Sequence, residues 1–92
     1  MQITVQYEAQ IRRAAGIRSE IVDVPDGSDV GACVRSVAEA HDDPLRNLLL
    51  TSEENVQPSV LLFVNDSQVL SDDESPLSDG DTLTFMTPIS GG

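Results

Sequence analysis

The sequence predicts an α+β domain in which one main helix packs across a mixed sheet of four or five strands. Three patterns support this. Apolar and polar residues alternate over residues 1–7, apolar residues recur with helical spacing over 30–41, and a continuous apolar run occupies 60–64. With further strand-like stretches, the elements follow the order β-β-α-β-β-β. A chain of 92 residues is long enough for one modest core and one domain.

The first half of the domain reads as a hairpin followed by the main helix. Residues 1–7 form an amphipathic strand, and residues 11–16 form a polar connection with a helical turn that ends at Gly16. Residues 18–24 supply a second strand, and the short connection favours antiparallel pairing with the first. The apolar side of the first strand carries Ile3, Val5 and Tyr7.

The main helix is expected after the turn at Pro25-Asp26-Gly27. Ser28 or Asp29 can cap its first turn, and Asp42-Asp43-Pro44 should end it. A short helical turn over residues 45–52 then closes one end of the core. One face of the main helix carries apolar residues and a final histidine: Val30, Cys33, Val34, Val37, Ala38 and His41.

The second half supplies the remaining strands. Residues 59–65 contain the continuous apolar run, which is typical of a strand covered on both faces or paired on both edges. A turn at Asn65-Asp66 leads to a short strand over 68–70, and a last strand follows over 82–87. The crossing helix allows the first and last strands to lie side by side, parallel, at the centre of the sheet.

The charge of the chain is strongly negative and unevenly distributed. The formal net charge is −11, and the five basic residues are all arginines that lie before residue 47. Such a surface argues against nucleic acid as a partner and favours a basic cleft on another protein. A solvated acidic surface explains the charge as well, and compositional bias explains the absence of lysine.

Several classes of site and location are not expected. No apolar run is long enough to cross a bilayer, and no basic-then-apolar leader precedes the domain, so we expect no membrane partner and a cytoplasmic location. The single cysteine cannot form an internal disulfide. No cluster of cysteine and histidine residues predicts a metal site.

The last fourteen residues have the most informative pattern in the sequence: a turn, a strand, a proline and a diglycine end. Asp79-Gly80-Asp81 is a tight-turn signal, the last strand follows, and Pro88 cannot donate to a sheet ladder. We therefore expect a domain over 1–88 and a flexible tail over 89–92 that ends in Gly91-Gly92. Glycines without Cβ atoms can pass through a narrow channel, which suits a protein whose terminal carboxylate is its reactive group.

These residues resemble the MoaD/ThiS family of ubiquitin-like sulfur carriers, and specifically the small subunit of molybdopterin synthase. The resemblance covers the whole chain, and its fold is the β-grasp. It is most specific at the C-terminal end, while Val64-Asn65-Asp66 is similar to the family's turn after its central strand. The other segments that carry the resemblance are Ala14-Ala15-Gly16, Pro25-Asp26-Gly27, Pro76-Leu77-Ser78-Asp79-Gly80-Asp81 and Pro88-Ile89-Ser90-Gly91-Gly92.

The resemblance implies a carrier protein that is not itself an enzyme and holds no cofactor stably. An E1-like adenylyltransferase would use ATP to activate the Gly92 carboxylate, and a sulfur donor would convert it into a thiocarboxylate. An acceptor synthase, similar to the large subunit of molybdopterin synthase, would then take the sulfur. Gly92 is the reacting group, and the residues expected to bind partners are Met86, Pro88, Ile89, Ser90 and Gly91.

The sequence leaves several pathways open for the sulfur acceptor. The C-terminal match favours molybdenum cofactor biosynthesis, but Met86 and Thr87 replace the aromatic and proline residues that this branch often carries before Pro88. The same Gly92 chemistry would serve cysteine, thiamin or tRNA thiolation. An activated terminus could also be attached to lysines of other proteins, and a non-covalent binding module is the fourth reading.

Three other candidates are better explained by structure than by chemistry. Cys33 lies on the apolar face of the main helix, where cysteine usually acts as a small hydrophobe rather than as a transfer thiol. His41, at the end of that face, is expected to make a helix-terminus contact. Asp72-Asp73-Glu74 lacks the spaced ligands of a calcium site and is expected to be a solvated loop.

Overall fold

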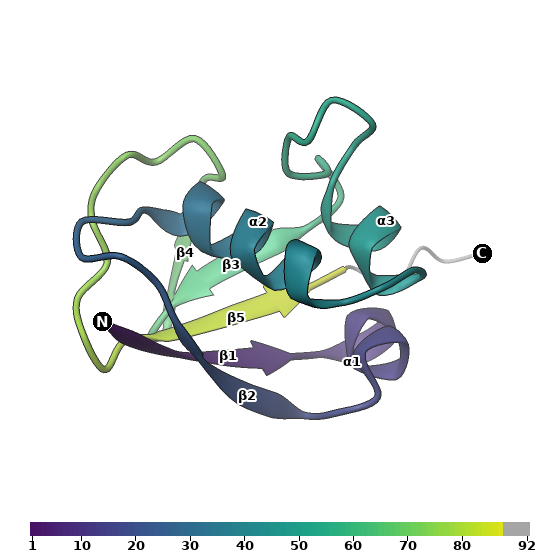
Figure 1. Ribbon diagram of the computed structural model, residues 1–92, viewed down its shortest axis with the longest axis horizontal. Coiled ribbons are helices and arrows are strands. Elements are labelled where there is room, and N and C mark those ends of the chain that lie inside the picture. Colours follow the sequence, from purple (N-terminus) through teal and green to yellow (C-terminus); the bar gives the residue numbers. More distant parts are fainter. Residues whose placement is uncertain (88–92) are drawn as a thin grey trace.

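The computed structural model describes residues 1–87, which form one mixed sheet with three helices (Figure 1). The sheet has five strands in the order β2-β1-β5-β3-β4. The predicted α+β class and the predicted order of the elements are therefore confirmed. The strands are β1 (Gln2–Tyr7), β2 (Ser19–Asp23), β3 (Leu61–Val64), β4 (Ser67–Val69) and β5 (Thr82–Met86).

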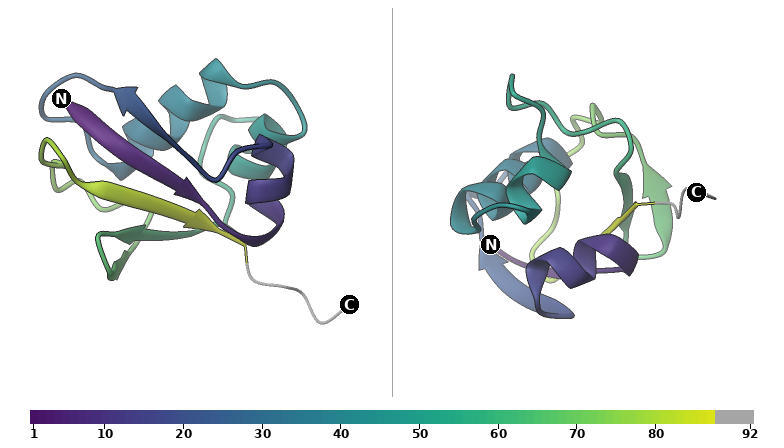
Figure 2. Two further views of the ribbon diagram at one scale, coloured as in Figure 1. Left: turned by 90° about the horizontal axis from the view of Figure 1, so that it is seen from below. Right: turned by 90° about the vertical axis from the view of Figure 1, so that its right-hand side faces the viewer.

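The parallel pairing of the first and last strands is also confirmed. β1 and β5 are parallel neighbours at the centre of the sheet, and their register aligns Val5 with Leu83 and Tyr7 with Phe85. β1 also pairs antiparallel with β2, and β5 pairs antiparallel with β3. Figure 2 shows β1 and β5 side by side, with both strands ending near the helix α1.

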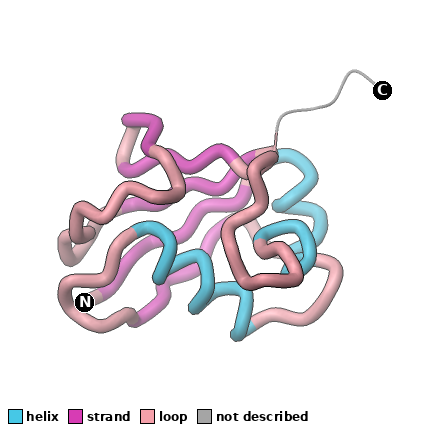
Figure 3. Tube along the Cα trace, turned by 90° about the horizontal axis from the view of Figure 1, so that it is seen from above, coloured by secondary structure: helices cyan, strands magenta, loops and turns pink. Residues whose placement is uncertain are grey.

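The main helix α2 (Val30–Ala40) lies across one face of the sheet (Figures 1 and 3). Asp29 caps it, since its Oδ1 accepts a hydrogen bond from the backbone N–H of Ala32 at 2.9 Å. Every apolar residue predicted for its inner face is buried. These residues pack on the side chains that β1 and β5 turn toward the helix: Ile3, Val5, Tyr7, Leu83 and Phe85.

Two shorter helices close the end of the core. α3 (Leu45–Leu49) matches the helical turn expected after Pro44 and buries Leu45 and Leu49. α1 (Ala9–Ala15) begins earlier than the expected turn, and Gly16 ends it with φ +75° while its N–H donates to Arg12 O at 3.0 Å. Its buried Ile11 explains why these residues form a helix rather than a surface loop.

Several strands are shorter than expected. The apolar run over residues 60–64 contributes only Leu61–Val64 to β3, which is paired on both edges but has only one buried residue, Leu62. Leu70 was expected in the following strand, but it lies beyond β4 and is 70% exposed. Among residues 1–87, no helix is long and apolar enough to cross a membrane.

Candidate functional site

The residues that lead to the C-terminal tail are carried by a central strand. β5 has a partner on each edge, since Thr82 to Phe85 pair with β1 and Leu83 to Met86 pair with β3. The backbone N–H of Glu8, just after β1, donates to Phe85 O at 3.0 Å and so extends this pairing. The strand before the tail is therefore held on both edges through Phe85 and on the β3 edge at Met86.

Burial of two of its side chains in the core also holds β5 in place. Leu83 and Phe85 are both fully buried. The Phe85 ring meets Tyr7 edge to face, with 5.8 Å between the ring centroids and an interplanar angle of 74°. β5 cannot shift without breaking this core contact, so it forms a rigid base for the residues that follow.

The turn before β5 is tied to the first strand. Gly80 adopts φ +88°, and its N–H donates to Gln2 O at 2.8 Å. Asp79 Oδ1 accepts from the N–H of Gln2, and Asp81 Oδ2 accepts from the N–H of Ser78. Asn65, in the turn after β3, accepts a hydrogen bond from the N–H of Thr82 at 3.1 Å. The predicted turn residues therefore set where β5 begins.

Met86, one of the residues expected to bind partners, lies on the opposite face of β5 from Phe85 and is half-buried. Together with Phe63 it lines a shallow hollow of about 220 Å³ on the sheet. The sequence did not single out Phe63, because a continuous apolar run hides which of its residues face outward. The other lining residues are Gln6, Glu8, Asn65, Asp66 and Thr84.

A cluster of three polar side chains joins β1, β2 and the end of α2. The Tyr7 hydroxyl donates to Glu20 Oε2, and His41 Nε2 lies 2.7 Å from the same oxygen. Burial first, and the contact with Glu20 second, raise the pKa of Tyr7 well above its ordinary value. His41 therefore makes a side-chain contact with β2 beyond its place at the helix terminus, which spacing along α2 could not show.

The remaining sequence candidates have structural surroundings. Cys33 is fully buried, and burial raises the pKa of its thiol to about 11. The backbone N–H of Ser75 donates to Asp73 Oδ1 at 2.8 Å and lowers the pKa of that carboxyl. Within residues 1–87, no three side chains of metal-ligating type gather into a possible ion site.

The other predicted site residues are Pro88, Ile89, Ser90, Gly91 and Gly92, and they lie outside the described residues. The predicted division into a domain over 1–88 and a tail over 89–92 also falls at this limit. The structure thus gives the base of the predicted site: a central strand, its core anchor and Met86 on the outer face.

Comparison with known proteins gives matches over the whole chain. Residues 5–92 match the model of the ThiS family. The chain is 29% identical to ubiquitin-related modifier 1 of Yarrowia lipolytica and 27% identical to the molybdopterin synthase sulfur carrier subunit of Chlamydomonas reinhardtii. It is 32% identical to small archaeal modifier protein 3 of Haloferax volcanii. Each alignment covers 100% of both chains.

Solved structures show the same fold at lower sequence identity. SAMP1 from Haloferax volcanii superposes with a TM-score of 0.88 at 22% identity, over 100% of both chains. A chain in the complex of subunits 1 and 2 of molybdopterin-converting factor from Helicobacter pylori gives 0.65 at 18%, again over 100% of both chains. The fold is the ubiquitin-like β-grasp. The chain belongs to the ThiS family of small ubiquitin-like sulfur carriers and modifiers, whose members are not themselves enzymes.

Proposed function

We propose that this protein carries sulfur as a thiocarboxylate on Gly92. The observation that carries the proposal is that the family match runs through residue 92 and includes the diglycine. The preceding strand is fixed on both edges, while residues 1–87 offer neither an exposed thiol nor a cluster of metal-ligating side chains. A rigid base followed by a slim reactive terminus suits chemistry performed in the active sites of other proteins.

The reaction proceeds in two steps. A Gly92 carboxylate oxygen attacks the α-phosphate of ATP in an E1-like enzyme, pyrophosphate leaves, and an acyl adenylate forms. Hydrosulfide from the sulfur donor then attacks the activated carbonyl, and AMP leaves, which gives the thiocarboxylate. The thiocarboxylate sulfur is a better nucleophile than a carboxylate oxygen, so it can attack an electrophilic acceptor. Gly91 and Gly92 lack side chains, which lets enzyme groups approach the carbonyl closely.

Partners would dock on the outer face of the sheet around Met86 and Phe63. These two half-buried apolar residues line one hollow, with Met86 at the end of β5 and Phe63 opposite Thr84 on β3, and an apolar contact there would hold the carrier with its tail in the partner's channel. Pro88, Ile89, Ser90 and Gly91 would then lie along that channel. The Helicobacter pylori complex, in which a chain of the same fold sits with a second subunit, supports a docking carrier.

The acceptor we favour is the synthase of molybdenum cofactor biosynthesis. The full-length similarity to the Chlamydomonas reinhardtii molybdopterin synthase sulfur carrier subunit supports it. Cysteine, thiamin and tRNA thiolation use the same activated carboxylate and are the alternatives. An acceptor pulled down with the wild-type protein but not with a variant lacking Gly92 distinguishes among them.

A second candidate function is attachment to lysines of other proteins. Two of the full-length relatives are named as modifiers, and the activated Gly92 carbonyl would react with a lysine amine to form an isopeptide bond. The chain contains no lysine, so its own side chains offer no amine for a second copy. High-mass covalent conjugates in a host lysate, lost on deletion of Gly92, are the expected sign of this function.

The test of sulfur carriage is the intact mass of the protein purified from its host, with and without an alkylating reagent. We expect a mass gain that matches one oxygen replaced by sulfur, and alkylation at this group in a Cys33→Ser variant. This variant serves as the control because Cys33 is the chain's single thiol. An unmodified carboxylate after incubation with ATP, the host E1-like enzyme and a sulfur donor would overturn the proposal.

A further inference from the structure

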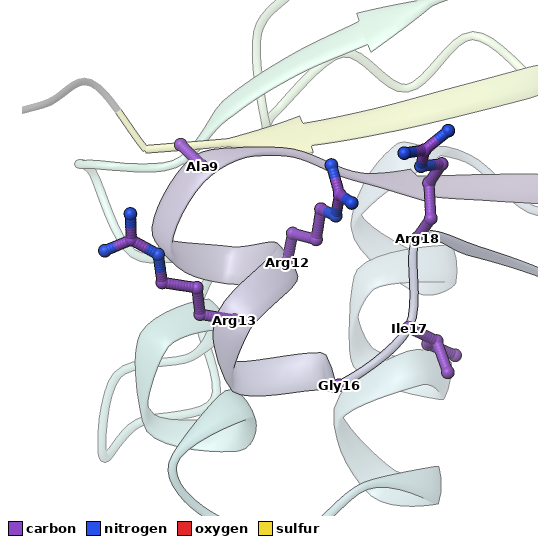
Figure 4. A pocket seen from close by; sticks show the side chains of 6 residues that line it. All are labelled: Ala9, Arg12, Arg13, Gly16, Ile17 and Arg18. Carbon is purple, nitrogen blue, oxygen red and sulfur yellow. The ribbon is translucent and has the colours of Figure 1, made fainter.

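The described part of the chain has one pocket lined by three arginines and no acid. It surrounds the end of α1, has a volume of about 510 Å³ and opens to solvent. Figure 4 shows its side chains around the turn of the helix, with Ala9 beside the end of β5. The lining residues are Ala9, Arg12, Arg13, Gly16, Ile17 and Arg18.

The composition of this pocket contrasts with the rest of the surface. The chain has sixteen acids and only five basic residues. Arg46 lies 3.6 Å from Glu54, and Arg35 lines a different pocket with Asp29, Asp72 and Glu74. Of the two arginines outside the pocket, one forms an ion pair and the other lines a pocket with three acids, whereas the three inside it share their lining only with apolar residues and glycine.

The pocket is fixed at the end of the sheet from which the tail continues. The N–H of Tyr7 donates to Arg18 O at 2.9 Å, and Tyr7 pairs with Phe85. On the other side of α1, the N–H of Glu8 donates to Phe85 O. The arginine segment is therefore connected by backbone hydrogen bonds to the strand that ends at Met86. Any protein that takes up the tail would pass close to this pocket.

Stabilisation of α1 explains only part of this grouping of arginines. Arg12 and Arg13 lie in the last turn of α1, where positive charge stabilises a helix through its macrodipole. Arg18 lies after the helix and gains nothing from that effect. Three like charges within seven residues also repel one another, so helix stability alone does not account for their grouping.

We propose that the arginine pocket receives an acidic surface of the protein that activates the tail, and so orients the carrier on it. This proposal rests on the proposed function, since it needs an enzyme that adenylates Gly92. Carboxylates match the guanidinium groups in charge and in geometry, and the exposed Ile17 adds an apolar edge. A local positive patch on a chain of net charge −11 also selects one orientation during encounter.

The test compares two double variants in adenylation by the E1-like enzyme of the same host. Arg12→Gln/Arg18→Gln removes two charges from the pocket, and Arg35→Gln/Arg46→Gln removes two charges elsewhere. Each double variant makes the net charge more negative by two, so the second is a matched control for the first. Because rim charges act mainly on association, we expect the pocket variant to raise KM about threefold to tenfold at low salt, with kcat unchanged. The control should leave both constants near their wild-type values.

Two further measurements complete the test: KM at added salt, and binding of a nucleic acid. Added salt should raise KM for the wild type, and the pocket variant should respond less. Equal KM values for the two doubles would overturn the pocket as a docking site. So would a fluorescently labelled host tRNA that binds the wild type but not the pocket variant while KM stays unchanged. If the enzyme does not adenylate even the wild type, the proposed function fails too, which separates that result from failure of the pocket alone.

Discussion

At the scale of single residues, the buried thiol of Cys33 makes a clear chemical prediction. Burial raises its pKa to about 11, so near pH 8 almost none of it is thiolate in the folded protein. We expect iodoacetamide to modify Cys33 only after unfolding in urea, as measured by intact mass. Rapid labelling of the folded chain would show that α2 opens more readily than its packing indicates, and would require Cys33→Ser in every alkylation test of Gly92.

Two glycines should respond differently to alanine. Gly80 adopts φ +88°, where a Cβ costs about 1 kcal/mol, so Gly80→Ala should destabilise the protein by roughly that amount. Gly31 lies in α2 with an ordinary φ, and a Cβ there would meet Arg35 Nη1 at 3.4 Å, the end of a side chain that can move. Gly31→Ala should therefore be neutral or stabilise by up to about 0.5 kcal/mol. Urea unfolding measures both; similar losses would contradict this explanation.

Residue roles were predictable from the sequence where they follow from local chemistry. Asp29 as a helix cap, Cys33 as a core residue and Met86 on the face opposite Phe85 all follow from spacing along one element. The outward-facing Phe63 and the three-arginine pocket did not follow. Both depend on which elements fold against one another, which one segment of sequence does not contain.

At the scale of elements, the contact among Tyr7, Glu20 and His41 joins β1, β2 and the end of α2. Tyr7→Phe removes the hydroxyl but leaves the ring packed on Phe85, so we expect a loss of about 1–2 kcal/mol in the free energy of unfolding. His41→Ala should cost less once Tyr7 is already Phe, if the two share Glu20. Strictly additive losses in a double-mutant cycle would show that the two contacts act independently.

The same tyrosine predicts a pH dependence. Its pKa is raised in the folded state above the ordinary value of 10.0, so its contribution to stability is complete below pH 10 and is lost as pH rises further. The urea midpoint of the wild type should fall in that range, and Tyr7→Phe should fall less steeply. Because the chain has one tyrosine, tyrosinate absorbance should appear together with unfolding. Ionisation well before unfolding would contradict the burial of Tyr7.

Element positions were predicted better than their lengths. The alternation over residues 1–7 and the helical spacing over 30–41 located β1 and α2, because one buried face imposes each period. α1 was expected only as a turn, since its single buried residue, Ile11, gives no repeating pattern. Leu70 was expected in the short strand after the turn at Asn65-Asp66, and the structure leaves it exposed beyond β4.

At the scale of the whole molecule, the parallel pairing of the first and last strands is what places the end of β5 next to α1. It was predictable because a helix that crosses the sheet returns the chain in the same direction. The consequence for function was not predictable from the elements one by one. Only the assembled sheet brings Arg18, Phe85 and Met86 to one end, where a partner could contact the arginine pocket and the tail together.

The large negative net charge of the whole molecule gives the last prediction. A net charge of −11 on 92 residues repels itself most strongly when the chain is compact, and salt screens that repulsion. The free energy of unfolding should therefore rise with sodium chloride, and potassium chloride should act alike because screening depends on ionic strength. Asp72→Asn/Glu74→Gln, which removes two acids from an exposed loop, should reduce the slope. A response that saturates at low concentration, or that differs between the two cations, would instead indicate a specific ion site and would contradict screening as the cause.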